Sequence, residues 1–106
     1  MGFNLENVTV THYEDEQRFE AIISETRALV TYQRSPGRIT FLHTEVPPSL
    51  EGQGLAAKLV RVALEFARAQ NLQVVPLCPY VSSFIRKHTE YQDLVSPEQL
   101  QKMFTR

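Results

Sequence analysis

The feature that most constrains this chain is a turn, rich in proline and glycine, that leads from a strand-like run into an amphipathic helix. The run covers residues 38–46, the turn residues 47–54, and apolar residues then recur at helical spacing to about residue 70. A helix N-terminus presents backbone N–H groups without intrahelical partners and the positive end of the helix dipole. Glycines there let a ligand approach the backbone. The junction therefore predicts a site for a phosphate or pyrophosphate.

Composition limits the kind of protein. The chain has 106 residues, which predicts one domain over residues 1–106. The net charge is −1 and the basic residues form no long block, which argues against a general nucleic-acid binder. The sequence has no apolar run of about 18 residues and no N-terminal pattern of a secretory signal, so no membrane span or export is expected. A single cysteine cannot form an internal disulfide, so a cytoplasmic setting is expected.

Residue periodicity divides the chain into strands followed mainly by helices. Strands are expected at residues 8–11, 18–24, 27–33, 38–46 and 73–77, and helices at residues 54–70, 79–88 and 96–103. Because a strand–helix–strand unit contains the long helix, the last strand must pair in a parallel or near-parallel way. The expected class is α+β, a mixed, mostly antiparallel sheet with a central amphipathic helix and shorter C-terminal helices.

Two local details refine this expectation. Asn71 is a plausible stop for the long helix. Strict alternation along residues 38–46 assigns side chains to opposite faces of the sheet. The two expected sets are Ile39, Phe41, His43 and Glu45 on one face, and Leu42, Thr44 and Val46 on the other.

The glycine spacing discriminates among phosphate-binding loops. The Walker string has no match, and the dinucleotide fingerprint needs three glycines after the first strand, whereas this loop has two after a late strand. The string present is Val-x-Pro-x-x-x-Gly-x-Gly-x-Ala. It resembles the acetyl-CoA motif of the GNAT superfamily of N-acetyltransferases. Gly52, Gly54 and Ala56 match that motif, and Val46 matches the strand residue that pairs with the pantetheine arm.

The resemblance extends over about residues 7–95, because the strings at 43–47, 78–80 and 90–94 are similar to a short, minimal GNAT subfamily. It implies a minimal GNAT-like fold and acetyl-CoA or coenzyme A as the cofactor. It also implies that the pantetheine arm lies between the strands at 38–46 and 73–77, which splay apart. The implied cofactor-binding residues are Val46, Glu51, Gly52, Gln53, Gly54, Leu55, Ala56, Ala57, Lys58 and Cys78.

Two of these residues carry charge. Glu51 stands where the superfamily usually has arginine or glutamine, and its carboxylate would repel a pyrophosphate, so a role is assigned to its backbone N–H alone. Lys58 lies one turn into the helix. It either contributes positive charge to the site or is a solvated surface cation.

Acetyl transfer to an amine, the implied activity, needs a neutral amine and a protonated leaving thiolate. A free lysine amine has a pKa of about 10.4, so a base assists. Most GNAT enzymes use as acid a tyrosine on the helix after the last core strand, and Ile85 aligns with that position here. Three roles are open for Cys78: it accepts the acetyl group as a nucleophile, it hydrogen-bonds the sulfur of coenzyme A, or it is a buried thiol that fills space. His43 and Glu45 act as base and orienting partner, or have structural roles.

Three functions remain open on the sequence. The first is an acetyl-CoA-dependent N-acyltransferase acting on an amine, with a protein or peptide lysine as a candidate acceptor. The second is a CoA-binding or acyl-CoA-binding module with little or no activity, and the third is a turn without a ligand. No nucleic-acid or membrane partner is expected, and an exposed edge strand leaves both a monomer and a weak dimer open. No metal site is expected, because His12, His43 and His88 lack ligand spacing.

Overall fold

The computed structural model describes residues 4–105, which form a five-stranded sheet and helices. The strands are β1 (Val10–Tyr13), β2 (Arg18–Ile23), β3 (Thr26–Ser35), β4 (Arg38–Glu45) and β5 (Gln73–Pro76), and they lie side by side in chain order. The first four pair antiparallel, whereas β5 pairs parallel to β4. The predicted α+β class with a mixed, mostly antiparallel sheet is confirmed.

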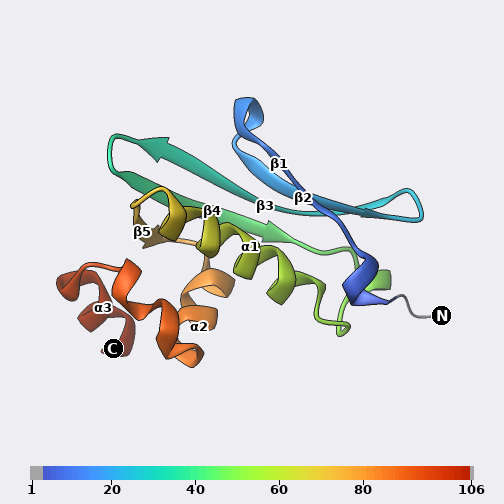
Figure 1. The fold of residues 1–106 in the computed structure, drawn as a ribbon. Coiled ribbons are helices and arrows are strands. Elements are labelled where there is room, and N and C mark those ends of the chain that lie inside the picture. The colour runs from blue at the N-terminus through green and yellow to red at the C-terminus, as the bar shows by residue number, and fades with distance from the viewer. Residues whose placement is uncertain (1–3, 106) are drawn as a thin grey trace.

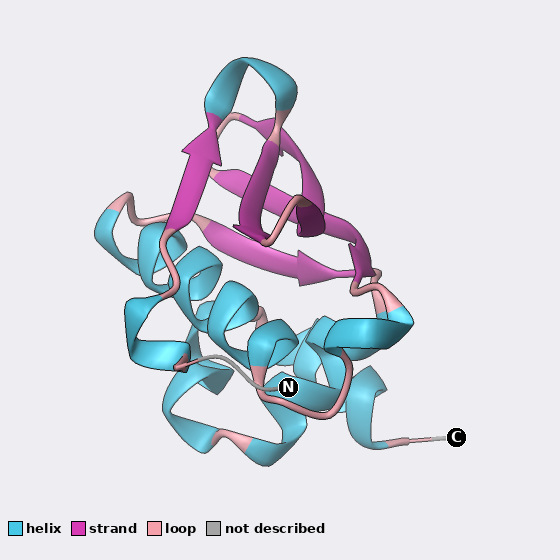
Figure 2. Cartoon of the chain, turned by 90° about the vertical axis from the view of Figure 1, so that its right-hand side faces the viewer, coloured by secondary structure: helices cyan, strands magenta, loops and turns pink. Residues whose placement is uncertain are grey.

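Three α-helices lie on one side of this sheet (Figures 1 and 2). They are α1 (Leu55–Ala69), α2 (Pro79–Lys87) and α3 (Pro97–Phe104). Four short 3-10 helices occupy the connections: η1 (Leu5–Asn7), η2 (Glu14–Glu16), η3 (Pro48–Leu50) and η4 (Thr89–Leu94). The predicted central helix is therefore α1, which crosses beneath the sheet and leads directly into β5.

Helix α1 is held by its apolar stripe. Leu55, Leu59 and Leu64 are almost completely buried, and they belong to one core with Phe19 and Phe41 of the sheet. Burial of each such side chain contributes about 1.5–3 kcal/mol to the free energy of unfolding, before the loss of conformational entropy is counted. Because this core fixes the axis of α1, it also fixes where the helix N-terminus lies relative to β4.

The end of α1 follows the expected pattern. Asn71 adopts the left-handed conformation with φ 57°. Its N–H donates to the carbonyl of Arg68, and the N–H of Leu72 donates to the carbonyl of Ala67. These two bonds form a Schellman motif, which stops the helix and directs the chain into β5.

A β-bulge in β4 makes the predicted alternation of faces wrong beyond Phe41. Phe41 pairs with Tyr32, but His43 pairs with Thr31, so Leu42 is an extra residue without a partner on β3. Thr44 pairs with Val30, which is completely buried on the helix side of the sheet. Residues directly opposite each other share a face, so Thr44 faces the helices and His43 faces the outer side.

Strands β4 and β5 separate beyond this bulge. Their parallel pairing ends at Phe41 and Pro76, after which β4 continues to Glu45. The chain after β5 turns into α2, and the N–H of Cys78 donates to the carbonyl of Phe41 at 2.9 Å. The outer part of β4 therefore has an edge that β5 does not cover, as the splayed strands implied by the sequence require.

Candidate functional site

A cavity of about 530 Å³ lies where the uncovered part of β4 passes the N-terminus of α1. Its lining comes from β4 and the following residue (His43, Thr44, Glu45, Val46), from the turn and the start of α1 (Leu50, Glu51, Gly52, Gly54, Leu55, Ala56, Ala57), and from α2 (Tyr80). The fold thus brings together all the predicted site residues except Gln53, Lys58 and Cys78. A cavity of about 420 Å³ over β1 and β2 is lined by none of them.

The N-terminus of α1 lacks the usual side-chain cap. Its N-cap residue is Gly54, whereas α3 is capped by Ser96, whose hydroxyl oxygen accepts a hydrogen bond from the N–H of Gln99. Within residues 4–105, the N–H groups of residues 52–57 have no hydrogen-bond partner. Donors at a helix N-terminus that no side chain satisfies are suited to an anion.

The backbone of the turn requires its two glycines. Gly52 and Gly54 have φ angles of 80° and 84°, a region that costs a residue with a Cβ about 1–2 kcal/mol. A Cβ on Gly54 would also lie 3.2 Å from a methyl carbon of Leu5. The glycines are therefore needed for the shape of the turn, in addition to leaving room for a ligand.

Two predicted contributors are engaged elsewhere. The N–H of Glu51 donates to the carbonyl of Pro48 at 3.3 Å, within the turn of η3. The ammonium of Lys58 donates to the carbonyl of Leu5 at 2.8 Å. Lys58 lines an adjoining cavity of about 400 Å³ at the helix start. The run of N–H groups without partners thus begins one residue later than predicted, at Gly52.

The catalytic candidates lie on different sides of β4. His43 and Glu45 are exposed, share the outer face of the sheet, and form no hydrogen bond with each other. Cys78 is buried, with 3% of its surface exposed, and its sulfur lies 3.3 Å from the hydroxyl oxygen of Thr44. Thr44 lines the cavity, whereas Cys78 does not.

The position that resembles the usual acid is inside the core. Ile85 is completely buried. Tyr80, in the first turn of α2, lines the cavity and is 39% exposed. Partial burial raises the pKa of the Tyr80 hydroxyl above its usual range, so the hydroxyl is protonated at neutral pH.

Sequence reasoning left Thr44 and Leu50 out of the predicted site, although both line the cavity. Tyr80, for which the sequence left open a place on the acceptor side or in the core, lines the cavity too. Thr44 was hidden by the bulge, which has no signature in the residue pattern. Leu50 is an apolar residue inside a polar turn, and that exception is a signal that it packs inward. Tyr80 follows a helix-starting proline, so its place in the first turn of α2 was available, but its direction was not.

The described residues set two further limits. Among residues 4–105, no helix has the length and the apolar character needed to cross a membrane. In the same part of the chain, no three His, Cys, Asp or Glu side chains gather in a group that could hold a metal ion.

Comparison with known proteins identifies relatives. Residues 18–94 match the family model described as GCN5-related N-acetyl-transferase. The chain is similar to Protein NATD1 of Bos taurus, with 28% identity over 95 residues that cover 85% of this chain and 84% of that protein. It is also similar to Protein NATD1 of Gallus gallus, with 29% identity over 84 residues that cover 76% of each.

The fold is also similar to a solved structure. The NMR solution structure of a GCN5-like protein from Staphylococcus aureus superposes with a TM-score of 0.68 and 29% sequence identity. The match covers 85% of this chain and 89% of that one. The resemblance drawn from the glycine turn and the strings around it is confirmed by the family match and by this fold.

Proposed function

The chain belongs to the GCN5-related N-acetyltransferases, and on that premise we propose that it is an acetyl-CoA-dependent N-acyltransferase that transfers an acetyl group to an amine. The observation that carries the proposal is the cavity between the uncovered edge of β4 and the uncapped start of α1. This cavity supplies backbone donors for an anion at one end and a strand edge at the other. Coenzyme A, with a pyrophosphate joined to a pantetheine arm that carries amides, has the matching groups.

Binding of the cofactor would use mainly the backbone. The pyrophosphate would accept hydrogen bonds from the N–H groups of residues 52–57, which have no partner among residues 4–105. The helix dipole contributes about 0.3–2 kcal/mol to holding an anion, so these hydrogen bonds must supply the rest. The pantetheine arm would lie along Thr44 and Val46, with its thioester toward Tyr80.

The reaction is a direct acyl transfer. The amine nitrogen forms a bond to the thioester carbonyl carbon, the carbon–sulfur bond breaks, and its electron pair stays on sulfur. The new ammonium loses a proton to a base, and the thiolate gains one, so the products are an amide and coenzyme A. Each proton transfer contributes about 10²–10⁴-fold when a positioned group assists it.

Three cavity residues suit these proton transfers. Tyr80 carries a protonated hydroxyl and is our candidate for donating a proton or hydrogen bond to the leaving sulfur. Glu45 and His43 line the same cavity from the outer face and are the candidates for the base. Cys78 is set back from the cavity against Thr44, which favours direct transfer over an acetyl-cysteine intermediate.

The charge around the cavity favours a cationic acceptor. Glu45 and Glu51 line it, and among residues 4–105 no lysine or arginine does. All three α-helices lie on one side of the sheet, so the outer face is left for a large acceptor (Figure 2). A lysine of a protein or peptide is the acceptor that we propose. The cytoplasm, with its supply of acetyl-CoA and its reducing conditions, is the compartment that we propose.

Release of free thiol from acetyl-CoA tests the proposal. The acceptors are a lysine peptide, the same peptide with its lysines acetylated as the control, a polyamine, and glutamate as an anionic amine. We expect more thiol release with the unmodified peptide and with the polyamine than with glutamate or with the blocked peptide. Equal release with the blocked peptide would mean hydrolysis and would contradict amine transfer.

A binding module is the second candidate, because Ile85, the residue aligned with the usual acid, is completely buried. Calorimetry separates the two functions. Saturable binding of coenzyme A together with no thiol release for every acceptor would establish the module. Absence of binding would exclude both functions and leave the loop as a tight turn.

A further inference from the structure

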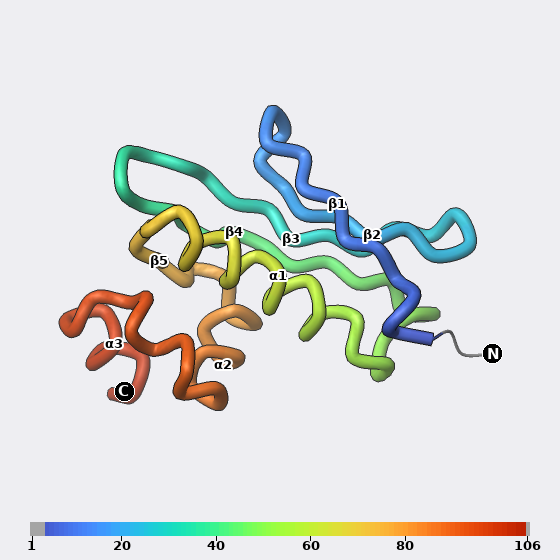
Figure 3. Tube along the Cα trace, viewed as in Figure 1, coloured from blue at the N-terminus to red at the C-terminus, as the bar shows by residue number. Residues whose placement is uncertain are grey.

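The short N-terminal helix η1 lies against the start of α1, although about fifty positions separate the two in the chain (Figures 1 and 3). Leu5 makes two contacts there. Its side chain packs where a Cβ on Gly54 would lie, at 3.2 Å, and its carbonyl accepts a hydrogen bond from Lys58 at 2.8 Å. Asn4 supports the turn, because its side-chain oxygen accepts a hydrogen bond from the N–H of Glu6 at 3.0 Å.

A second cavity lies between η1 and α1. Its volume is about 400 Å³, and it is lined by Leu5, Glu6, Gly54, Ala57, Lys58 and Arg61. It shares Gly54 and Ala57 with the larger cavity, so the two meet at the uncapped helix start. A ligand held at residues 52–57 could therefore extend from one cavity into the other.

Lys58 is the cation available in this second cavity. The guanidinium of Arg61 is already engaged, 3.2 Å from the hydroxyl of Tyr91 and 3.6 Å from the carboxylate of Glu90. The ammonium of Lys58 has three N–H groups, of which Leu5 accepts one, so two remain to be donated to an anion. Glu6 is the carboxylate that opposes Lys58 in this cavity.

We propose that η1 is a working part of the cofactor site: the carbonyl of Leu5 positions Lys58, and Lys58 binds the phosphate on the ribose of coenzyme A. This inference rests on the proposed function. The main cavity holds the pyrophosphate and the thioester arm, and the second cavity holds the nucleotide end. Leu5 is a positioning residue, since it acts on the ligand through Lys58.

The test is the ratio of two affinities, for coenzyme A and for 3′-dephospho-coenzyme A, measured by calorimetry on the full chain. The unmodified protein is expected to bind coenzyme A about five- to tenfold more tightly, as one charge-assisted contact at a half-exposed site gives. Lys58→Met should reduce the ratio to about one by weakening coenzyme A binding alone. Glu6→Gln should raise the ratio, and Lys87→Met, an exposed lysine on α2, is the matched control that should leave it unchanged.

The role of Leu5 needs a double-mutant cycle. Leu5→Ala keeps the carbonyl but removes the side chain that packs at Gly54 and holds η1 against α1. The carbonyl should then be held less firmly beside Lys58, so the ratio should fall about two- to threefold, and the same substitution in the Lys58→Met protein should change it no further. The inference would be overturned if Lys58→Met weakened the binding of both ligands equally, or if the effects of the two substitutions on the ratio were additive. Either result would leave the proposed function intact. No binding of either compound by the unmodified protein would instead contradict the proposed function itself. Thermal unfolding of each variant verifies that it is folded.

Discussion

At the residue scale, three glycines adopt the same left-handed backbone conformation but lie in different parts of the fold. Gly37, Gly52 and Gly54 all have φ between 72° and 84°. Gly37 lies in the turn between β3 and β4, whereas the other two line the main cavity. Their comparison therefore separates the cost of backbone strain from a role in binding.

Replacement of each glycine by alanine is expected to lower the free energy of unfolding by about 1–2 kcal/mol, because the left-handed region is unfavourable for a residue with a Cβ. Gly52→Ala and Gly54→Ala should also weaken coenzyme A binding at least tenfold, whereas Gly37→Ala should not change it. Urea unfolding and calorimetry measure the two effects. An equal loss of affinity in Gly37→Ala would show that the loop has no specific part in binding.

Tyr80 gives the second prediction at this scale. Tyr80→Phe removes the hydroxyl and keeps the ring that lines the cavity. The substitution should lower kcat by about 10²-fold or more, because the leaving thiolate loses its donor, and should leave coenzyme A affinity within about twofold. Steady-state kinetics and calorimetry provide the measurements. Cys78→Ala is the comparison variant, and we expect it to retain kcat, since Thr44 stands at the cavity in its place. An unchanged kcat in Tyr80→Phe would remove Tyr80 from the mechanism.

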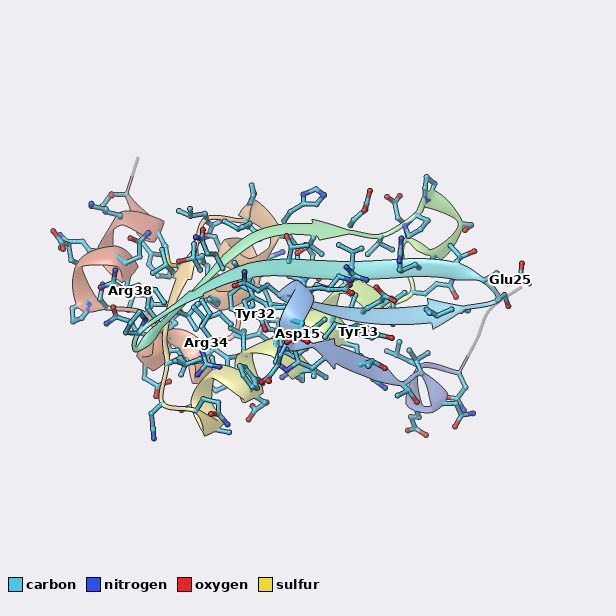
Figure 4. All side chains as sticks on the ribbon, turned by 90° about the horizontal axis from the view of Figure 1, so that it is seen from above. Tyr13, Asp15, Glu25, Tyr32, Arg34 and Arg38 are labelled. Carbon is cyan, nitrogen blue, oxygen red and sulfur yellow. The ribbon has the colours of Figure 1, made fainter. Side chains whose placement is uncertain are left out.

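At the scale of elements, the β2–β3 hairpin carries strain at its tip, where Figure 4 labels Glu25. Ser24 and Glu25 form a two-residue loop between the paired residues Ile23 and Thr26, and both have positive φ, 49° and 70°. This is the geometry that asparagine–glycine prefers. The sequence offered no such dipeptide, so it predicted the two strands without predicting how tightly they are joined.

The double substitution Ser24→Asn and Glu25→Gly should therefore raise the free energy of unfolding by about 1 kcal/mol. Urea unfolding checks this result. The control is Glu25→Ala, which removes the charge but keeps the Cβ. A similar gain in that control would assign the effect to charge rather than to the backbone.

Strand β1 is attached through an aromatic cluster around His12. The imidazole stacks on Phe19 at 3.9 Å between ring centroids, meets the edge of Phe66 at 4.5 Å, and shares a hydrogen bond with the hydroxyl of Tyr32. Burial lowers the pKa of His12 below its usual value, and the positive charge of Arg34 lowers it further, although Glu14 acts in the opposite direction.

A lowered pKa means that the unfolded chain binds a proton at higher pH than the folded protein does. The His12 contribution to stability is therefore complete above about pH 6.5 and is lost as the pH falls toward the folded pKa. We expect the melting temperature to fall between pH 7 and pH 5, and His12→Phe to flatten that dependence. Calorimetric scans at several pH values test it, with His43→Gln as the control at an exposed histidine. An identical slope in His12→Phe would contradict the assignment.

At the scale of the whole molecule, the cavity joins parts of the chain that are distant in sequence. Residues from β4, the glycine turn, α1 and α2 line it, so a ligand there binds the folded chain and not the unfolded one. At a concentration one hundred times its dissociation constant, coenzyme A should add about 2.7 kcal/mol to the free energy of unfolding. For a domain of this size, the melting temperature should then rise by about 10 °C or more.

Thermal unfolding with increasing coenzyme A measures this shift. Gly54→Ala should show a much smaller rise at the same concentrations, because its affinity is lower. A rise of equal size in that variant would place the ligand elsewhere on the molecule.

The choice between a monomer and a weak dimer stays a prediction, with β1 as the edge strand concerned.

The sequence by itself determined the class of fold, the order of its elements and the glycine turn before α1. These features depend on local causes: alternation in the strands, helical spacing in α1, the left-handed preference of Asn71, and glycines at Gly52 and Gly54 where φ is positive. Such signals lie within a few neighbouring residues. The boundaries of most elements were therefore close to those observed, with β1 starting two residues later, after η1.

The tertiary structure decided which of these residues face the cavity. The bulge at Leu42 moved Thr44 to the helix side, and packing against Thr44 set Cys78 back from the cavity. The carbonyl of Leu5, more than fifty positions away in the chain, engaged Lys58. These outcomes depend on pairing and packing between distant segments, and a residue pattern along the chain carries no information about which distant atom will come within hydrogen-bonding distance.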